Sequence, residues 1–205
     1  LSLWIRLYHR SKNWMTYHFE YKGTALNLLE SLDYLGQNYA IEKTNVFAKN
    51  ELGGHVRKFI PSLIRGIIGD DDRYVVKGSV GQSQWANVPW VAIMDSTVTT
   101  TPQEGFYLVF LLKEDSSGIY LSLNQGVTNL KAKYGGSTSS ALKSQANDYI
   151  AQLSLSDSSY VQGVIDLAAT GDGSNGDLYQ YGAVYSKYYD MSSLPSNDKL
   201  ESDLS

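Results

Sequence analysis

The chain has 205 residues, enough for one domain that buries about 70% of the surface of its unfolded chain. Hydrophobic residues make up 42% and charged residues 19%, a balance typical of globular proteins and not of disordered ones. The chain has no cysteine, which excludes disulfides, a thiolate nucleophile and Cys-ligated zinc. That absence fits a cytoplasmic protein, and no apolar run approaches the roughly 20 residues of a membrane span.

Charge is distributed unevenly along the chain. The net charge is −4 and the pI is near 5.3, which argues against a simple cationic DNA-binding module. Residues 1–150 hold 15 Lys+Arg and 13 Asp+Glu, whereas residues 151–205 hold 2 and 8. Any bound DNA is therefore expected on the first part of the chain and away from the acidic last part.

Residues 1–22 are an aromatic and basic arm with no initiating Met at position 1. They fit either a basic arm that touches phosphate or a solvated tail, native or appended, and we assign them no function. The domain proper is expected to span residues 23–205, because neither a flexible linker nor an internal repeat divides them.

Helical spacing dominates residues 24–68. Thr24 can N-cap a first helix, whose apolar stripe is Leu28, Leu29, Leu32, Leu35 and Tyr39. A second helical region follows over residues 52–67, and Pro61 is expected to split it. Its polar side carries a basic patch of His55, Arg57, Lys58 and Arg65. This patch is either a solvated helix face or a surface for DNA phosphates.

The densest strand signal lies in residues 74–123. Runs rich in β-branched and aromatic residues predict strands over residues 74–80, 89–94, 105–113 and 119–123. Residues 114–118 are short, polar and end in glycine, as a hairpin connection requires. Pro89 is compatible with the start of its strand, where it need not donate a ladder hydrogen bond.

The region after Thr128 mixes loops and helices. Residues 131–137 are expected to form a Gly/Ser-rich loop, followed by a helix from about Ser140 and a strand over residues 160–167. Residues 171–177 predict a surface turn, because the carboxylate spacing of a calcium loop is missing. Residues 178–190 predict a tyrosine-rich helix, and Asn197 a cap for a short terminal helix.

Helices cluster before and after the strands and do not alternate with them. This order predicts an α+β fold with a mainly antiparallel, curved central sheet, against which the helices pack.

Two tryptophans bracket a loop of small polar residues. Gln82, Ser83 and Gln84 come directly before Trp85, and Trp90 follows Trp85 by five positions. Aromatic rings beside hydrogen-bonding side chains suit a pocket for a flat ligand with polar edges. The other interpretation is that both rings cap the core beneath a loop, since tryptophan is usually largely buried.

The common catalytic signatures are missing. The chain has no nucleotide-binding phosphate loop and no nucleophile elbow, and its three histidines lack metal-ligand spacing. We therefore expect a binding domain that is not an enzyme and needs neither cofactor nor metal ion.

A long motif gives the chain a family resemblance. Residues 77–92 read K-G-S-x-G-x-x-x-W-A-x-x-P-W-x-A, residues 105–111 read G-F-Y-L-V-F-L, and residues 120–128 read Y-L-S-L-N-Q-G-V-T. This pattern resembles the N-terminal DNA-recognition domain of McrB-type, modification-dependent (type IV) restriction proteins, over roughly residues 25–204. The resemblance implies double-stranded DNA carrying a modified base as the ligand, and a GTPase/AAA-type motor or nuclease module in the same or a partner chain. It implies no membrane association.

The resemblance also implies a site. In the family, a methylated cytosine is flipped out of the duplex into an aromatic pocket. Carried over by position, that pocket is formed by Trp90, Tyr107 and Leu111, with Ser79, Gln82 and Trp85 beside it. Where the best-known relative has an aromatic residue, this chain has Gln82, which leaves the preferred modification open. The expected contacts to the DNA backbone are Lys77, Ser83, Gln84, Arg57, Lys58, Lys131 and Lys133.

Two other functions remain open. The acidic, tyrosine-rich last part also suits a protein-interaction or assembly module that positions a motor or nuclease without reading bases. An unrecognised nuclease would instead cut DNA by itself in a metal-dependent reaction.

Overall fold

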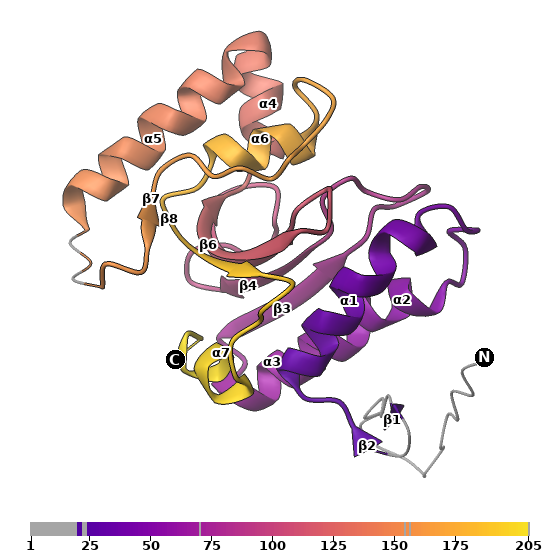
Figure 1. Ribbon diagram of the computed structural model, residues 1–205. Coiled ribbons are helices and arrows are strands. Elements are labelled where there is room, and N and C mark those ends of the chain that lie inside the picture. Colours follow the sequence, from indigo (N-terminus) through magenta and orange to yellow (C-terminus); the bar gives the residue numbers. More distant parts are fainter. Residues whose placement is uncertain (1–19, 22–23, 70, 154, 156, 205) are drawn as a thin grey trace.

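One antiparallel sheet forms the centre of the molecule. The architecture comes from a computed structural model that describes residues 20–21, 24–69, 71–153, 155 and 157–204 (Figure 1). The sheet has the order β3-β4-β5-β6-β8-β7, and every neighbouring pair is antiparallel. Its strands are β3 (Tyr74–Ser79), β4 (Trp90–Asp95), β5 (Phe106–Leu112), β6 (Gly118–Gln125), β7 (Val161–Gln162) and β8 (Tyr185–Asp190). The predicted α+β class and curved antiparallel sheet are confirmed.

The N-terminal helices cover one face of this sheet, here called the helix face (Figure 1). The elements on it are α1 (Leu28–Glu42), α2 (Glu51–Gly54), the π-helical segment η1 (His55–Phe59), α3 (Ile60–Ile68) and the late helix α7 (Asn197–Ser202). The sheet contributes an unbroken apolar set that includes Val91, Ile93, Phe110 and Leu112. Alternate residues of each strand point to this face, so burial there is a direct consequence of the period-2 pattern.

The start of α1 differs from the prediction. Thr24 does not cap the helix, because it lies in β2 (Thr24–Ala25), which pairs with β1 (Glu20–Tyr21). Asn27 is the N-cap: its side chain accepts a hydrogen bond from Glu30 N at 2.9 Å, and the Glu30 carboxylate accepts one from Asn27 N at 2.9 Å. This reciprocal pair satisfies two backbone donors and fixes the first turn.

The second helical region is not split at Pro61: α2, η1 and α3 follow one another without a non-helical residue, and the change to π-helical spacing lies before the proline. The boundary between η1 and α3 puts Pro61 in the first turn of α3, where its missing N–H costs no helical hydrogen bond. Gly69 ends α3 with a φ of +86°, a conformation that favours glycine.

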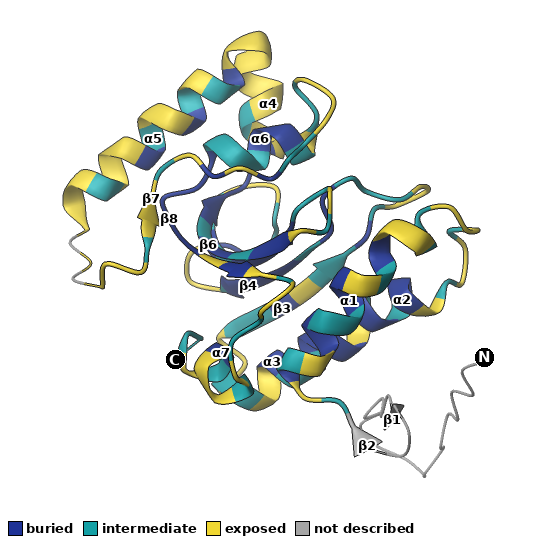
Figure 2. Cartoon of the chain, in the orientation of Figure 1, coloured by how far each residue is buried: buried dark blue, intermediate teal, exposed yellow. Residues whose placement is uncertain are grey.

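Helices α4 (Thr128–Tyr134), α5 (Thr138–Gln152) and α6 (Asn175–Tyr181) lie together at the other end of the sheet (Figure 1). The helix expected from about Ser140 is confirmed as α5. The loop predicted over residues 131–137 is wrong, because this stretch is the end of α4 followed by the 3-10 turn η2 (Gly135–Ser137). The strand predicted over residues 160–167 is reduced to β7. Figure 2 shows the inner strands buried and the outward surfaces of α4 and α5 exposed.

The tyrosine-rich segment 178–190 is the largest error of the prediction. It is not one helix: α6 ends at Tyr181, and residues 185–190 form β8, which pairs with β6. Gly182 separates the two, and a Cβ there would lie 2.4 Å from the Asn124 side-chain oxygen. Pairing with a buried strand overrides the helical spacing of the tyrosines. The terminal helix is confirmed, with Ser196 and not Asn197 as its cap.

Helix α7 is tied to the sheet by a buried charge. Asp203 follows this helix and accepts hydrogen bonds from Lys187 and from the Tyr189 hydroxyl of β8, both at 2.8 Å. Lys187 is only 6% exposed, so the pair is shielded from water and removing one partner would strand the other. Within the described residues, none of the helices is long and apolar enough to cross a membrane.

Candidate functional site

The glycines of the K-G-S-x-G block shape the entrance to the site. A Cβ on Gly78 would lie 1.8 Å from the carbonyl oxygen of Val56, so glycine lets η1 pack directly on β3. Gly81 has a φ of +103° and turns the chain into the loop of residues 81–89. Ser79 Oγ accepts a hydrogen bond from Gly81 N at 3.1 Å, and Ala86 N bonds back to Val80 O at 2.8 Å. The motif therefore builds a rigid loop.

The sheet face opposite the helix face carries the aromatic residues of the motif, and is here called the pocket face. Trp90 of β4 is paired with Leu111 of β5, and Tyr107 of β5 with Asn124 of β6. Because partners across an antiparallel ladder share a face, the register brings the predicted Trp90, Tyr107 and Leu111 together.

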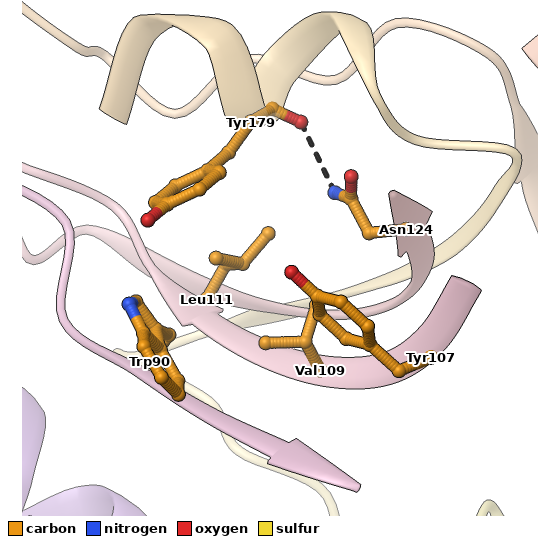
Figure 3. Close-up of a pocket in the computed structure, with 6 residues that line it drawn as sticks. All are labelled: Trp90, Tyr107, Val109, Leu111, Asn124 and Tyr179. Carbon is orange, nitrogen blue, oxygen red and sulfur yellow. Dashed lines mark hydrogen bonds between the residues drawn. The ribbon is translucent and has the colours of Figure 1, made fainter. Parts of the chain in front are cut away.

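A small cavity of about 10 Å³ lies between these side chains. It is lined by Trp90, Tyr107, Val109, Leu111, Asn124 and Tyr179 (Figure 3). Its volume is close to the room that one water molecule needs. Aromatic and aliphatic walls with a single amide suit a flat ligand with a polar edge.

Hydrogen bonds position the polar groups of the cavity. The Asn124 side-chain nitrogen donates to the main-chain oxygen of Tyr179 at 3.0 Å, and its oxygen accepts from Gln125 N at 2.7 Å (Figure 3). The Tyr107 hydroxyl donates to Pro102 O at 2.9 Å. Burial raises the pKa of both Tyr107 and Tyr179 above the ordinary value of a phenol. Both phenols therefore remain protonated, and able to donate, at neutral pH.

An open cleft of about 650 Å³ adjoins the cavity. One bank is the loop after β3, with Gln82, Gln84 and Trp85; the other is the start of α6, with Ser174, Asn175 and Gly176. Trp90 and Tyr179 line both the cleft and the cavity, so the two spaces meet at these rings. The second bank belongs to the acidic last part of the chain.

The remaining predicted pocket residues lie outside this small cavity. Ser79, Gln82 and Trp85 line the cleft instead. The Trp85 ring packs edge-on against Tyr39 and Phe47, with centroids 5.6 and 5.3 Å away, and its indole N–H donates to Asn45 O at 3.1 Å. This ring supports the bank of the cleft from the side of the helices, which matches the core-capping interpretation for Trp85.

The predicted backbone contacts are scattered around the molecule. Lys77 donates to Thr100 O at 2.9 Å, and Lys131 donates to Gly173 O at 2.6 Å, beside the second bank. Arg57 lies over Phe47 and reaches Gly81 O at 3.4 Å, which makes it a support for the first bank. The others are exposed: Ser83 and Gln84 in the loop, Lys58 on η1, and Lys133 on α4 with its ammonium 5.0 Å from the Tyr134 ring centroid.

Four residues of the site were missed in the sequence. Val109 lies between Tyr107 and Leu111 in the same alternation, so strand periodicity alone could have found it. Asn124 needed the β5–β6 register, and Tyr179 comes from a helix with no local signal for its position. Lys43 was also missed: it donates at 3.2 Å to the Asn87 side chain, which lines the cleft.

Charged groups elsewhere have structural partners. His55 is fully buried, its Nε2 lies 3.3 Å from Ser31 O, and burial lowers its pKa to about 4. Asp95 pairs with Arg73, whose Nε donates to it at 2.8 Å, and Glu104 accepts from Asn129. In the part of the chain that the structure describes, no group of three or more His, Asp or Glu side chains could hold a metal ion.

Comparison with known proteins agrees with this architecture. The model of the MrcB-like, N-terminal domain family matches residues 35–205, which is well over half of the chain. A search of curated proteins with this chain found no match. The family match confirms the resemblance carried by the motif and indicates a McrB-type DNA-binding module, a binding domain with no obvious catalytic role. The chain therefore belongs to the MrcB-like N-terminal domain family.

Proposed function

We propose that this domain recognises DNA that carries a modified base, with methylated cytosine as the first candidate, and that the base is flipped out of the duplex into the cavity of the pocket face. One observation carries the proposal. An aromatic cavity with a single amide adjoins a cleft open to solvent, and the same two rings, Trp90 and Tyr179, border both.

The cavity supplies the interactions that a flipped base needs. Flipping costs a few kcal/mol of unstacking, and stacking on an aromatic side chain returns about 1–3 kcal/mol per base. Trp90 and Tyr107 offer ring surfaces, and the Asn124 amide offers a group for the base edge. Val109 and Leu111 offer apolar contact for a methyl group at position 5 of cytosine. A plain cytosine would forgo this last contact.

The cleft offers room and charge for the strand that carries the base. Lys43 donates a hydrogen bond to the side chain of Asn87, which lines the cleft. Lys131 donates one to the carbonyl of Gly173, next to the second bank. Both ammonium groups bond to neutral oxygens, so they keep their full charge for phosphate. In this proposal Lys77, Ser83 and Gln84 remain further candidates for the backbone, whereas Arg57 acts by supporting the loop.

At the level of the whole system, we propose residues 23–205 as the targeting module of a type IV restriction system in the cytoplasm. A GTPase motor or nuclease module, in the same or another chain, would then act on the DNA that this domain selects. Residues 1–22 have no assigned role.

Binding to matched short duplexes tests the proposal. The duplexes carry plain cytosine, 5-methylcytosine, 5-hydroxymethylcytosine or N6-methyladenine, and each is titrated at two salt concentrations. We expect tight binding to one modified duplex with a modest salt dependence. Equal and steeply salt-dependent binding to all four would mean contact with the backbone only. No binding at low salt would contradict the proposal and favour the assembly module instead.

A further inference from the structure

The cavity is too small for the ligand that its walls suit. Its volume of about 10 Å³ holds about one water molecule, whereas the cleft beside it measures about 650 Å³. A base can enter only if a side chain that lines the cavity moves. Tyr179 and Trp90 line both the cavity and the cleft, so a displacement of either ring would enlarge the cavity toward the cleft.

Trp90 is the less mobile of the two. It belongs to β4, the second strand of the sheet, and its backbone is paired with Ser79 of β3 on one side and with Leu111 of β5 on the other. Tyr179 instead belongs to the short helix α6, and its ring projects from that helix across the cavity (Figure 3). In that view its hydroxyl and the Trp90 indole nitrogen are turned toward one another.

The backbone of α6 is fixed on both sides of Tyr179, so the moving part is the ring and not the helix. Asn124 holds the Tyr179 carbonyl at 3.0 Å. Gln180 accepts hydrogen bonds from Ile165 N through its main-chain oxygen at 3.2 Å and from Leu167 N through its side chain at 2.9 Å. Leu178 is 4% exposed and packs against α5 through Leu142.

We propose that the Tyr179 ring is a gate that fills the base position in the free domain and swings toward the cleft when a base enters. The gate deepens the proposed function and rests on it for the identity of the ligand. Because the α6 backbone stays in place, the displaced ring remains at the mouth of the cavity. Because the displaced ring stays close to the bound base, Tyr179 sets the size of the largest modification that the pocket accepts.

A closed gate lowers the apparent affinity of the free domain for its ligand. When the competent state is only a small fraction of the free protein, the apparent affinity falls by that fraction. Removing the ring should therefore tighten binding of any flat ligand that fits the cavity, whether or not the domain reads modified DNA. Apolar cavities of the size left by an aromatic truncation bind small aromatic molecules.

The test uses Tyr179→Ala, with Tyr181→Ala as the matched control. Tyr181 lies on the same helix, but its hydroxyl lies 3.3 Å from the Asp177 carboxylate and its ring lies 4.5 Å from the Lys143 ammonium. Indole and 5-methyl-2′-deoxycytidine are titrated into each protein, and binding is followed by the NMR signal of the Trp90 indole N–H. We expect Tyr179→Ala to bind indole at least about tenfold more tightly than the wild type, and Tyr181→Ala to match the wild type.

The duplex panel then separates the gate from base reading. The gate predicts that Tyr179→Ala accepts larger groups at position 5 of cytosine than the wild type does. If indole binds the wild type and Tyr179→Ala equally, the gate is overturned, even where the wild type prefers modified DNA. If indole binding increases but the wild type shows no preference among duplexes, the gate stands and the proposed function fails.

A second variant covers the case in which Tyr179→Ala does not fold. Tyr179→Phe keeps the ring and removes the hydroxyl that faces Trp90. The gate predicts a several-fold gain in affinity for indole, because the closed position loses a polar contact. An unchanged or weaker affinity would overturn the gate.

Discussion

The two faces of the sheet are formed by the same strands but differ in what packs against them. On β5, Phe110 and Leu112 point to the helix face, where their apolar side chains join the core beneath the helices. Tyr107, Val109 and Leu111 alternate with them on the pocket face, where they meet an amide, two further rings and a cavity. Under the proposed function, period-2 alternation assigns one side of the strand to the helix-covered core and the other to the base pocket. Substitutions one residue apart should therefore have different consequences.

The largest expected effect breaks the helix face. Phe110 is 1% exposed, so Phe110→Ala should lower the free energy of unfolding by about 3–5 kcal/mol, through lost burial and the cavity it leaves. Urea denaturation measures this loss. Val109→Ala, on the pocket face, is the matched variant and should cost less, because fewer atoms are removed. A loss for Phe110→Ala well below that range would contradict the assignment of Phe110 to the packed core of the helix face.

The helix face should also show the stronger pH dependence. The pKa of His55 is lowered to about 4 from its ordinary 6.5, so the unfolded chain binds its proton first as pH falls. The contribution of neutral His55 to the free energy of unfolding is complete above pH 6.5. About 3 kcal/mol of this free energy is lost as the pH falls toward 4. Unfolding measured across this range should show the loss, and His55→Gln should flatten it. A His55→Gln curve parallel to that of the wild type would exclude His55 as the cause.

On the pocket face, Trp90→Ala should affect recognition more than stability. The preference for a modified over a plain duplex should fall by about 1–3 kcal/mol, the value of one stacked base. Competition binding measures the preference, and thermal unfolding shows whether the fold survives. A stability loss as large as that of Phe110→Ala, with both duplexes weakened equally, would mean that Trp90 only packs the core.

The smallest effect sharpens the electrostatic part of the comparison. Lys131→Ala should reduce the slope of log K against log salt by about 0.9, the value of one phosphate contact. Stability should stay within about 0.5 kcal/mol. Lys133→Ala is the control, because that ammonium lies over Tyr134. Identical salt slopes for the two variants would remove Lys131 from the phosphate contacts.

The sequence predicted well the elements that local patterns define, and predicted poorly those that depend on contacts between distant residues. Strands β3 to β6 follow one another in the chain and each pairs with the next, so alternation and turn residues define them locally. Strand β8 was predicted as helix because tyrosines at 181, 185, 188 and 189 fit a helical period, and only its pairing with β6 decides otherwise. The prediction that Thr24 caps α1 failed for a smaller reason, since Asn27 offers a better cap three residues later.

The candidate site divides in the same way. Trp90, Tyr107 and Leu111 come from a continuous motif, and strand geometry puts them on one face. Asn124 and Tyr179 depend on register and on the placement of α6, which no local pattern encodes. Trp85 matched the motif yet packs against Tyr39 of α1 and Phe47 of the loop that follows α1, a contact between residues distant in sequence that the motif does not encode.

The most direct measurement follows the Trp90 indole N–H and the Asn124 side-chain amide by NMR during titration with two duplexes. The duplexes differ only in one methyl group on one cytosine. The account predicts large shifts of both signals with the methylated duplex and small shifts with the plain one, because only a flipped base reaches the cavity. Equal shifts with both duplexes, or binding that leaves both signals unmoved, would contradict base recognition on the pocket face.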